Sequence, residues 1–377
     1  MVAVPALIDA TAVPADRGGV GRYVDGVIAA LDGPFFIACQ ARDAAHYATL
    51  APSATVLPQR GIERVPLRLL WEQFALPQIA RSVGATVIHS PHYTLPLLTR
   101  RRRVVTLHDA TFFSDPAVHT ALKRLFFSTW IRVSVRLADA LIVPSRATAD
   151  ELARFVRSNA DDYVVAYHGV DPTVFHQPDA EQVTAAASTL ELEGRPWIAF
   201  LGTIEPRKNV PFLIAAYRQL VSEWDDSWGS VPVLAIAGGR GWETGVEPEL
   251  ALVEQPAEVR ELGFIELADV TGFLGGAELV AYPSSGEGFG LPVLEGMACG
   301  APVLTTTRLA LPEVGGDAVQ YAEPTVAGIH EALRSLVSDP ALRADLAARG
   351  PARAALFTWT ASALVHAATF ERVAANA

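Results

Sequence analysis

The sequence predicts an α/β protein of two doubly wound domains that face a cleft, and three observations support this. Short apolar runs alternate with helical patterns along the chain, which is typical of parallel sheets covered by helices. The length of 377 residues exceeds what one typical hydrophobic core accommodates. The alternation also begins afresh after a polar, alanine-rich segment at residues 177–195.

The first half contains four strand candidates, each of which ends at a polar or glycine-bearing turn. They read VPALIDA, TVIHSPHY, RVVTLHDA and ALIVPS, and helical patterns at residues 22–31 and 122–137 lie between them. In doubly wound sheets, ligands bind at the carboxyl ends of the strands. A functional site is therefore expected in the turns that follow these strands.

The second half contains five further strand candidates, PWIAFLGT, VPVLAIAGG, ELVAYPSS, APVLTT and AVQYAE, and helical patterns begin at residues 210 and 291. We expect the first domain to end near residue 177 and the second to begin at residue 178, because domain boundaries fall in polar linkers.

Composition excludes several classes of protein. The net charge of −11 argues against general nucleic-acid binding. No apolar run approaches the ~20 residues of a membrane-spanning helix, and no basic segment precedes the apolar N-terminus, as in a signal peptide. The two cysteines, Cys39 and Cys299, lie far apart and form no metal or disulfide pattern. These features predict a cytoplasmic protein.

The first candidate site is a glycine-rich loop, GGVGRY, after the first strand. Gly18, Gly19 and Gly21 would let the backbone approach a ligand, and a helix that begins near Val20 would favour an anion. An ordinary turn between a strand and a helix explains the same glycines.

The second candidate is the pair His108-Asp109 at the end of a buried strand. A polar pair there is costly unless it is hydrogen-bonded or has a function. A histidine at a cleft edge and a structural histidine both remain open, and His89 and His92 are more readily explained as structural.

The third candidate is the segment GTIEPRKN, in which Glu205, Arg207 and Lys208 precede a helix. Asn209 is expected to cap this helix, with Pro211 in its first turn. Two cations beside a positive helix end form a strong site for a polyanion. Lys208 is one of only two lysines in the chain, which makes an incidental surface charge a weaker explanation.

The fourth candidate is the segment EGFGLPVLEGMACGAPV, in which Glu287 and Glu295 are separated by seven residues. Pro292 is expected near the start of a helix whose first turn contains Glu295. Carboxylates accept hydrogen bonds from sugar hydroxyls, and the backbone amides between them can hold phosphate or hydroxyl oxygens. This combination suits a polyhydroxylated ligand.

The E-x7-E pattern resembles the signature of the retaining family 4 glycosyltransferases of the GT-B fold. The segments GTIEPRKN, VPSRATADEL and YHGVD are also similar to that family, and the resemblance extends from Gly18 to about Pro312. It implies two Rossmann-like domains. The N-terminal domain, on the acceptor side, would comprise residues 1–177 and a returning C-terminal helix at residues 358–377. The C-terminal domain, at residues 178–357, would bind a nucleotide sugar.

The resemblance also implies roles for the site residues. Arg207 and Lys208 would bind the diphosphate of the sugar donor and stabilise the leaving nucleotide. Glu295 would hold the ribose hydroxyls. His108 would lie beside the sugar near the reacting carbon.

Glu287 would position the donor hexose, together with the amides of Phe289, Gly290 and Leu291. Because Pro292 has no N–H, the expected anion contacts are the amides of Gly290 and Leu291 and those that follow Pro292.

The remaining implied contacts are with the phosphate and the base. Gly18 and Gly19 would approach the phosphate from the first domain. The nucleotide base would lie near Arg260, Leu262 and Gly263. No D-x-D triplet is present, so no metal is implied, and the cationic side chains would replace one. No cofactor is expected besides the nucleotide-sugar substrate.

We therefore expect a retaining hexosyltransferase that acts on a glycan or lipid-linked acceptor in cell-envelope polysaccharide or glycolipid synthesis. GGVGRY and LHD resemble bacterial GDP-mannose-dependent mannosyltransferases of the family, which favours GDP-mannose. UDP-sugar and dTDP-sugar donors remain open. The alternatives from other classes are a non-catalytic nucleotide-sugar-binding protein and an epimerase of the nucleotide sugar.

Residues 122–137 combine aromatic side chains with Lys123 and three arginines. A basic, aromatic helix can lie on an anionic membrane, so peripheral contact with the inner face of the plasma membrane is one hypothesis. A packed helix with a solvated basic edge is the other.

Overall fold

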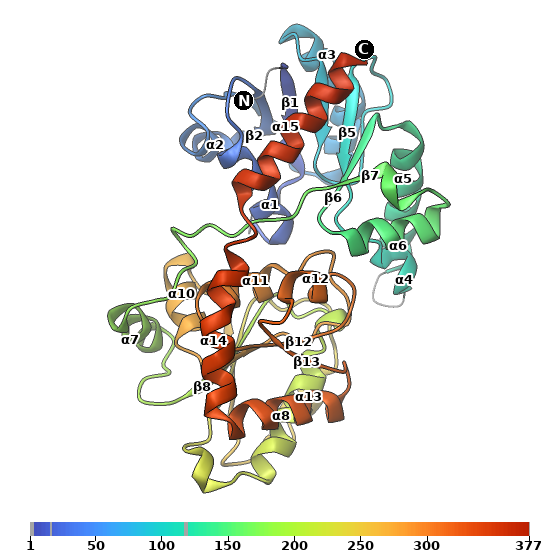
Figure 1. Cartoon of the computed structure of the whole chain (residues 1–377). Helices are drawn as coiled ribbons and strands as arrows, with labels where there is room; N and C mark the ends of the chain where they lie inside the picture. The colour runs from blue at the N-terminus through green and yellow to red at the C-terminus, as the bar shows by residue number, and fades with distance from the viewer. Residues whose placement is uncertain (1–3, 16, 117–119, 377) are drawn as a thin grey trace. The chain divides into compact units, whose positions relative to one another are not determined.

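The computed structural model describes residues 4–15, 17–116 and 120–376 (Figure 1). The chain divides into two compact units. Unit 1 comprises Met1–Gly169 and Thr358–Ala377, and unit 2 comprises Val170–Phe357. Each unit is a parallel sheet covered by helices, which confirms the predicted fold class.

Unit 1 is built on a seven-stranded sheet with the order β3-β2-β1-β4-β5-β6-β7, in which every pairing is parallel. The strand order reverses between β1 and β4, as in doubly wound folds. The strands are β1 (Ala6–Asp9), β2 (Phe36–Gln40), β3 (Thr55–Gln59), β4 (Val87–Ser90), β5 (Arg102–Thr106), β6 (Ala140–Val143) and β7 (Tyr163–Val165).

The central strands of unit 1 are buried along their whole length because helices cover both faces of the sheet. The last helix of the chain belongs to this unit, and its Phe370 packs into the same core as Ile8 and Val27. The helices are α1 (Gly19–Ala30), α2 (Ala44–Leu50), α3 (Val65–Ser82), α4 (Thr111–Ser114), α5 (Ala121–Leu137), α6 (Arg146–Val156) and α15 (Trp359–Ala375). Figure 1 shows α15, in red, beside α1.

Unit 2 has a six-stranded parallel sheet with the order β10-β9-β8-β11-β12-β13. The strands are β8 (Trp197–Leu201), β9 (Val233–Ala237), β10 (Val259–Gly263), β11 (Leu279–Ala281), β12 (Val303–Thr306) and β13 (Gln320–Ala322). The order reverses between β8 and β11, so this is the point at which a doubly wound sheet binds its ligand.

Eight α-helices among the described residues complete unit 2. They are α7 (Ala180–Thr189), α8 (Val210–Ser222), α9 (Val246–Leu250), α10 (Leu267–Gly275), α11 (Leu291–Ala298), α12 (Leu311–Gly315), α13 (Val326–Ser338) and α14 (Pro340–Ala354). Two of them, α8 and α11, follow directly from the turns after β8 and β11, and their N-terminal ends flank the switch point.

Unit 2 begins at Val170 rather than at residue 178, where the sequence placed the boundary. The backbone N–H of Val170 donates to the carbonyl of Phe357 (3.1 Å), and the hydroxyl of Thr271 donates to the carbonyl of Val174. These bonds hold residues 170–177 against the second unit. The polar, alanine-rich segment that suggested a linker forms α7 inside that unit.

Candidate active site

The turns that follow β8 and β11 are joined by hydrogen bonds at the switch point of unit 2. The backbone N–H of Ser285 donates to the carbonyl of Arg207 (2.7 Å), and the side-chain amide of Asn209 donates to the carbonyl of Pro283 (2.8 Å). Residues far apart in the sequence are thereby fixed next to one another. This local structure brings the third and fourth candidate segments together.

Asn209 does not cap α8 with its side chain, as the sequence suggested. Its backbone is left-handed (φ 54°), and it makes no side-chain cap hydrogen bond. The amide is used instead for the bond to Pro283, so this residue joins the two turns.

Glu287 is the centre of the buried cluster that these turns create. Its Oε1 accepts from the ammonium of Lys208 and from the hydroxyls of Tyr282 (2.9 Å) and Ser284 (2.8 Å). Its Oε2 accepts from the Nη1 of Arg207 (2.6 Å). The carboxylate thus has both oxygens committed to protein groups, four of them in all.

The protonation states follow from burial and charge. Burial alone would raise the pKa of Glu287, but Arg207 and Lys208 outweigh it and hold the pKa at about 2. Burial and the neighbouring Arg207 lower the pKa of Lys208 to about 8, although Glu287 favours the ammonium. At neutral pH the cluster therefore contains an ionised carboxylate between two cations.

Arg207 is also held from a second side. Its Nε donates to Glu205 (3.0 Å), and its Nη1 donates to the carbonyl of Gly286 (2.9 Å). Two carboxylates therefore match the two cations, and the guanidinium keeps 20% of its side-chain surface exposed. A partly exposed, rigid guanidinium beside an ammonium is suited to bind a phosphate group.

The network changes the interpretation of Glu287. The resemblance implied that this carboxylate positions the donor hexose, whereas here it orients the cations that would hold the diphosphate. Its contact with a hexose stays a prediction.

The segment after Glu287 leads into α11. Gly290 precedes the helix with a left-handed backbone (φ 103°), and a Cβ at this position would lie 2.8 Å from Leu311. The amides of Val293 and Leu294 both donate to the Gly290 carbonyl. These two amides complete the helix turn, so they are already used within the protein, and the predicted contact of the amides after Pro292 with an anion stays a prediction.

Glu295 lies beyond the first turn of α11, which contains no acidic residue, so its predicted place at the helix start is wrong. Its side chain is 2% exposed. The ring of Phe289 is also buried, in a perpendicular contact with Phe357 (5.7 Å). The predicted contacts of Glu295 with ribose, and of the Phe289, Gly290 and Leu291 amides with the sugar, stay predictions.

The three residues predicted to lie near the nucleotide base occupy different parts of β10. Arg260 pairs with Glu258 (2.6 Å) and donates to the carbonyl of Glu191. Gly263, at the carboxyl end of β10, accepts a bond from Gly238 (2.6 Å), and Leu262 precedes it. Only Leu262 and Gly263 therefore lie at the ligand-binding edge of the sheet, whereas the guanidinium of Arg260 is tied elsewhere.

Several residues at the ligand-binding edge of the unit 2 sheet were not predicted from the sequence. A Cβ on Gly238 would lie 2.1 Å from the carbonyl oxygen of Gly202, so the ends of β8 and β9 can approach only with glycine there. The signal was visible in VPVLAIAGG, which ends with a glycine pair. Tyr282 and Ser284 carried no signal, because their roles depend on contacts with Glu287.

The candidate residues of unit 1 form a separate group. Gly18 caps α1, and the described residues leave no atom within 4 Å of a Cβ on Gly18 or Gly19. Packing inside unit 1 therefore does not require these glycines. An approach to phosphate stays a prediction for both.

His108 is a neutral imidazole in unit 1. Its Nε2 donates to the carbonyl of Pro91 (2.7 Å), and its ring meets Tyr23 edge-on at 4.9 Å. Burial lowers its pKa, although Pro91 and Asp109 oppose the shift. This tautomer leaves Nδ1 as the acceptor of the ring, and contact with the sugar stays a prediction.

Asp109 has a structural role, since its Oδ1 accepts from the backbone and hydroxyl of Thr111 (3.2 and 2.9 Å). His89 bonds to Thr106 (2.9 Å), and burial lowers the pKa values of His89 and His92. The structural interpretation of these two histidines fits their surroundings.

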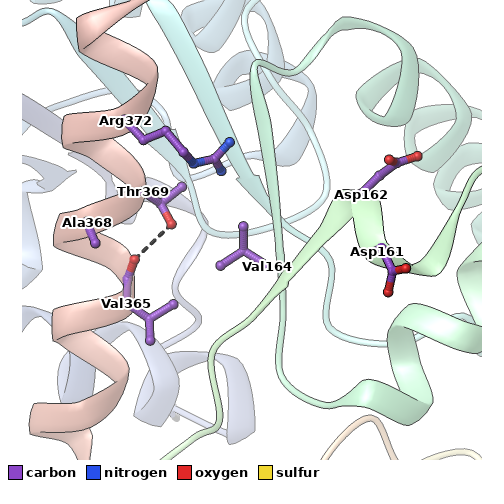
Figure 2. Close-up of a pocket in the computed structure, with 7 residues that line it drawn as sticks. All are labelled: Asp161, Asp162, Val164, Val365, Ala368, Thr369 and Arg372. Atoms are coloured by element: carbon purple, nitrogen blue, oxygen red, sulfur yellow. Dashed lines mark hydrogen bonds between the residues drawn. The ribbon is translucent and has the colours of Figure 1, made fainter.

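Unit 1 also has a surface cavity of about 620 Å³ beside β7 and α15 (Figure 2). Asp161, Asp162 and Arg372 line it, and in Figure 2 the hydroxyl of Thr369 donates to the carbonyl of Val365 within α15 (2.8 Å). No predicted site residue lines this cavity. Across the described parts of the chain, no group of His, Cys, Asp and Glu could hold a metal ion.

Two family models match the chain, one over most of unit 1 and the first residues of unit 2, the other within unit 2. Residues 17–174 match "Glycosyltransferase Family 4", and residues 182–353 match "Glycosyl transferases group 1".

Several curated proteins are similar in sequence. The O-antigen chain mannosyltransferase B of Escherichia coli is 31% identical over 277 residues, which cover 72% of this chain and 71% of that protein. The serotype-specific mannosyltransferase WbdA of E. coli is 29% identical, over 75% of this chain and 33% of its own length. A D-inositol 3-phosphate glycosyltransferase of Rhodococcus opacus is 32% identical, over 59% of this chain and 50% of its own.

Solved structures share the whole architecture. A sucrose-phosphate synthase of Thermosynechococcus elongatus aligns with a TM-score of 0.75 and 18% identity, over 99% of this chain and all of that chain. HepE of Anabaena, in complex with UDP and glucose, aligns with a TM-score of 0.75 and 16% identity, over 98% of this chain and all of its own. At these identities the similarity shows the fold, which is the GT-B fold.

Proposed function

The chain belongs to the glycosyltransferases of group 1 and family 4, and we propose that it transfers mannose from GDP-mannose to a glycan or lipid-linked acceptor, with retention of configuration. The enzyme class follows from the family. The sugar, the nucleotide, the acceptor and the stereochemistry belong to the proposal.

One observation carries the chemical part of the proposal. Arg207 and Lys208 lie at the switch point of unit 2, and the buried carboxylate of Glu287 binds and orients both cations. The leaving group of a nucleotide diphosphate sugar gains negative charge as the glycosidic bond breaks. Preorganised cations stabilise such charge without further reorganisation.

Mannose is favoured by the relatives, because mannosyltransferases of E. coli are among the similar proteins. Retention is proposed from the resemblance to the retaining family 4 enzymes. Front-face attack is proposed as its route, rather than a covalent intermediate, because both oxygens of Glu287 are committed to protein groups. Attack by the acceptor on the face that the diphosphate leaves would then give the retained product. The departing phosphate oxygen would accept the acceptor's proton.

Calorimetric titration with GDP, UDP and dTDP tests the nucleotide. We expect GDP to bind at least about tenfold more tightly than the other two, a difference of about 1.4 kcal/mol. The Arg207→Ala variant should weaken binding of all three, because the diphosphate is common to them. Tighter binding of UDP or dTDP would contradict GDP-mannose and leave the diphosphate site in place.

Peripheral membrane contact is a further part of the proposal. On α5, the exposed leucines of its N-terminal half are available for such contact, whereas Phe127 and Trp130 are not. The ring of Phe127 stacks on Phe112 (4.4 Å), and Trp130 packs into the same core, so these aromatics are used inside unit 1. Leu122 and Leu125 are 78% and 66% exposed at the N-terminal half of α5. No helix within the described ranges has the length and apolarity to span a bilayer.

We expect the protein to float with vesicles that contain anionic lipid, and to lose most of this binding when Leu122 and Leu125 are both replaced by aspartate. Leu252→Asp, at an exposed leucine of unit 2, is the matched control and should still float. Binding that is equal for all three proteins, or absent in low salt, would count against contact through α5.

A further inference from the structure

Tyr282 is a buried aromatic residue at the end of β11 whose position is set by three strands. Its side chain is 1% exposed, and its ring stacks on Phe200 of β8 (5.9 Å between centroids). Its backbone N–H donates to Leu304 (2.8 Å), and its carbonyl accepts from the hydroxyl of Thr305 (2.9 Å), both on β12. The ring is therefore held in place by contacts with β8 and β12.

The hydroxyl of Tyr282 lies between the two charges of the site. It accepts a hydrogen bond from the ammonium of Lys208 and donates one to Glu287 (2.9 Å). The ammonium lies at the hydroxyl end of the ring, 4.6 Å from the ring centre. Its contact with Tyr282 is therefore made through the oxygen.

Lysine needs such a contact more than arginine does. Its ammonium sits on a flexible four-carbon chain, whereas a guanidinium is planar and rigid. Lys208 is 6% exposed, so water cannot satisfy its three N–H donors as it would at a surface. Tyr282 and Glu287 each accept one of them, and a phosphate of the donor would accept the third.

We propose that Tyr282 is a positioning residue for the transfer reaction, which holds the Lys208 ammonium in place and keeps it charged through its hydroxyl. This inference depends on the proposed function, because it assigns a task to the cation that would bind the diphosphate. Tyr282 itself touches no reacting atom.

The hydroxyl of Tyr282 is expected to affect the reaction because it helps to keep Lys208 protonated. Burial and the neighbouring Arg207 lower the lysine's pKa to about 8, so a small further loss of stabilisation would discharge the amine near neutral pH. A phenylalanine at position 282 would keep the ring and its packing. It would remove the oxygen that accepts from the ammonium and the hydrogen that Glu287 accepts.

The chain permits a direct measurement, because Lys123 and Lys208 are its only lysines. Protein labelled with carbon-13 at the lysine Cε gives two side-chain signals, and Lys123→Arg identifies which belongs to Lys208. The pH titration of that signal reports the protonation of Lys208 without any substrate. Thermal unfolding shows that each variant is folded at the temperature of the titration.

We expect Tyr282→Phe to lower the pKa of Lys208 by about one unit, since a hydrogen bond to a charged group is lost. With GDP-mannose as substrate, kcat/KM should fall about twofold at pH 7 and about tenfold above pH 8, because the charged fraction of Lys208 falls by these factors when its pKa drops by one unit. The alkaline limb of the kcat/KM profile, which reports the free enzyme as the titration does, should move to lower pH by the same amount. A hydroxyl with a merely structural role would not move that limb.

Tyr217→Phe is the matched control, because the buried hydroxyl of Tyr217 in the same unit donates to the carbonyl of Pro232 (2.7 Å), away from the site. It should leave both the Lys208 titration and the pH profile unchanged. An unchanged Lys208 pKa in Tyr282→Phe would overturn the proposal, and so would a shifted pKa with an unshifted alkaline limb. If the unmodified protein transferred no sugar, the proposed function would fail, whereas the titration would still decide whether Tyr282 stabilises the ammonium.

Discussion

Replacement of Arg207 or Lys208 by alanine is expected to lower kcat by about 10²–10³-fold, which is typical when one preorganised group that stabilises transition-state charge is lost. Both side chains lie where the turns after β8 and β11 meet, and Glu287 holds both. Neither effect should be matched by an equal loss of acceptor affinity, because the two cations act on the leaving diphosphate.

The measurement is the initial rate of nucleotide release at saturating sugar donor. Arg218→Ala is the control for Arg207, because Arg218 also pairs with a glutamate, Glu249 (2.9 Å), on the outer side of α8. It should retain its rate. Near-normal turnover in both Arg207→Ala and Lys208→Ala would remove these cations from the mechanism.

The second large effect is expected from Glu287→Gln. Removal of one partner from a buried ion pair typically costs about 3–5 kcal/mol of stability, and here it leaves Arg207 and Lys208 without their shared carboxylate. The variant should therefore unfold at a lower temperature and lose most of its activity. Glu249→Gln breaks a half-exposed pair with Arg218 and should cost about 0–1 kcal/mol.

The pH dependence gives this prediction a second test. The folded-state pKa of Glu287, about 2, lies below its ordinary value of 4.5. The stability that it contributes is therefore fully present above pH 4.5 and is lost as the pH falls from there towards 2. The difference in free energy of unfolding between the parent protein and Glu287→Gln should shrink over that range. A constant difference, or a loss no greater than that of Glu249→Gln, would contradict the buried network.

Much of the fold could be predicted because its signals are local. Strands such as VVTLHDA and helices such as Leu291–Ala298 are fixed by apolar runs and by the glycines and prolines at their ends. The pairing of an arginine-lysine turn with an E-x7-E segment also pointed to one site, and the structure joins these turns through Arg207, Ser285, Asn209 and Pro283.

The roles inside the site could not be predicted as well, because they depend on contacts between segments. Glu287 looked like a carboxylate for a ligand, but the hydroxyls of Tyr282 and Ser284 and two cations occupy both of its oxygens. Nothing in the sequence around Tyr282 shows that its hydroxyl reaches Lys208, which lies 74 positions away in the chain.

The remaining differences have similar causes. Asn209 is a common helix-capping residue, but a carbonyl of the neighbouring turn takes its amide. Arg260 lies on the strand that the resemblance indicated. Its guanidinium, however, binds the carboxylate of Glu258 and the carbonyl of Glu191, which hold it away from the ligand-binding edge. Propensity and spacing cannot resolve such competition between partners.

The most direct test of the account is a stoichiometric transfer assay with the sugar donor of whichever nucleotide binds most tightly. Nucleoside diphosphate, free sugar and glycosylated product are measured together, with a short mannoside as acceptor and with water alone. The account predicts one nucleoside diphosphate for each sugar transferred or hydrolysed, and almost none from the Arg207→Ala, Lys208→Ala double variant. Tight binding without any release would instead indicate a nucleotide-sugar-binding protein, and release of an epimerised sugar without an acceptor would indicate an epimerase; either would contradict the account.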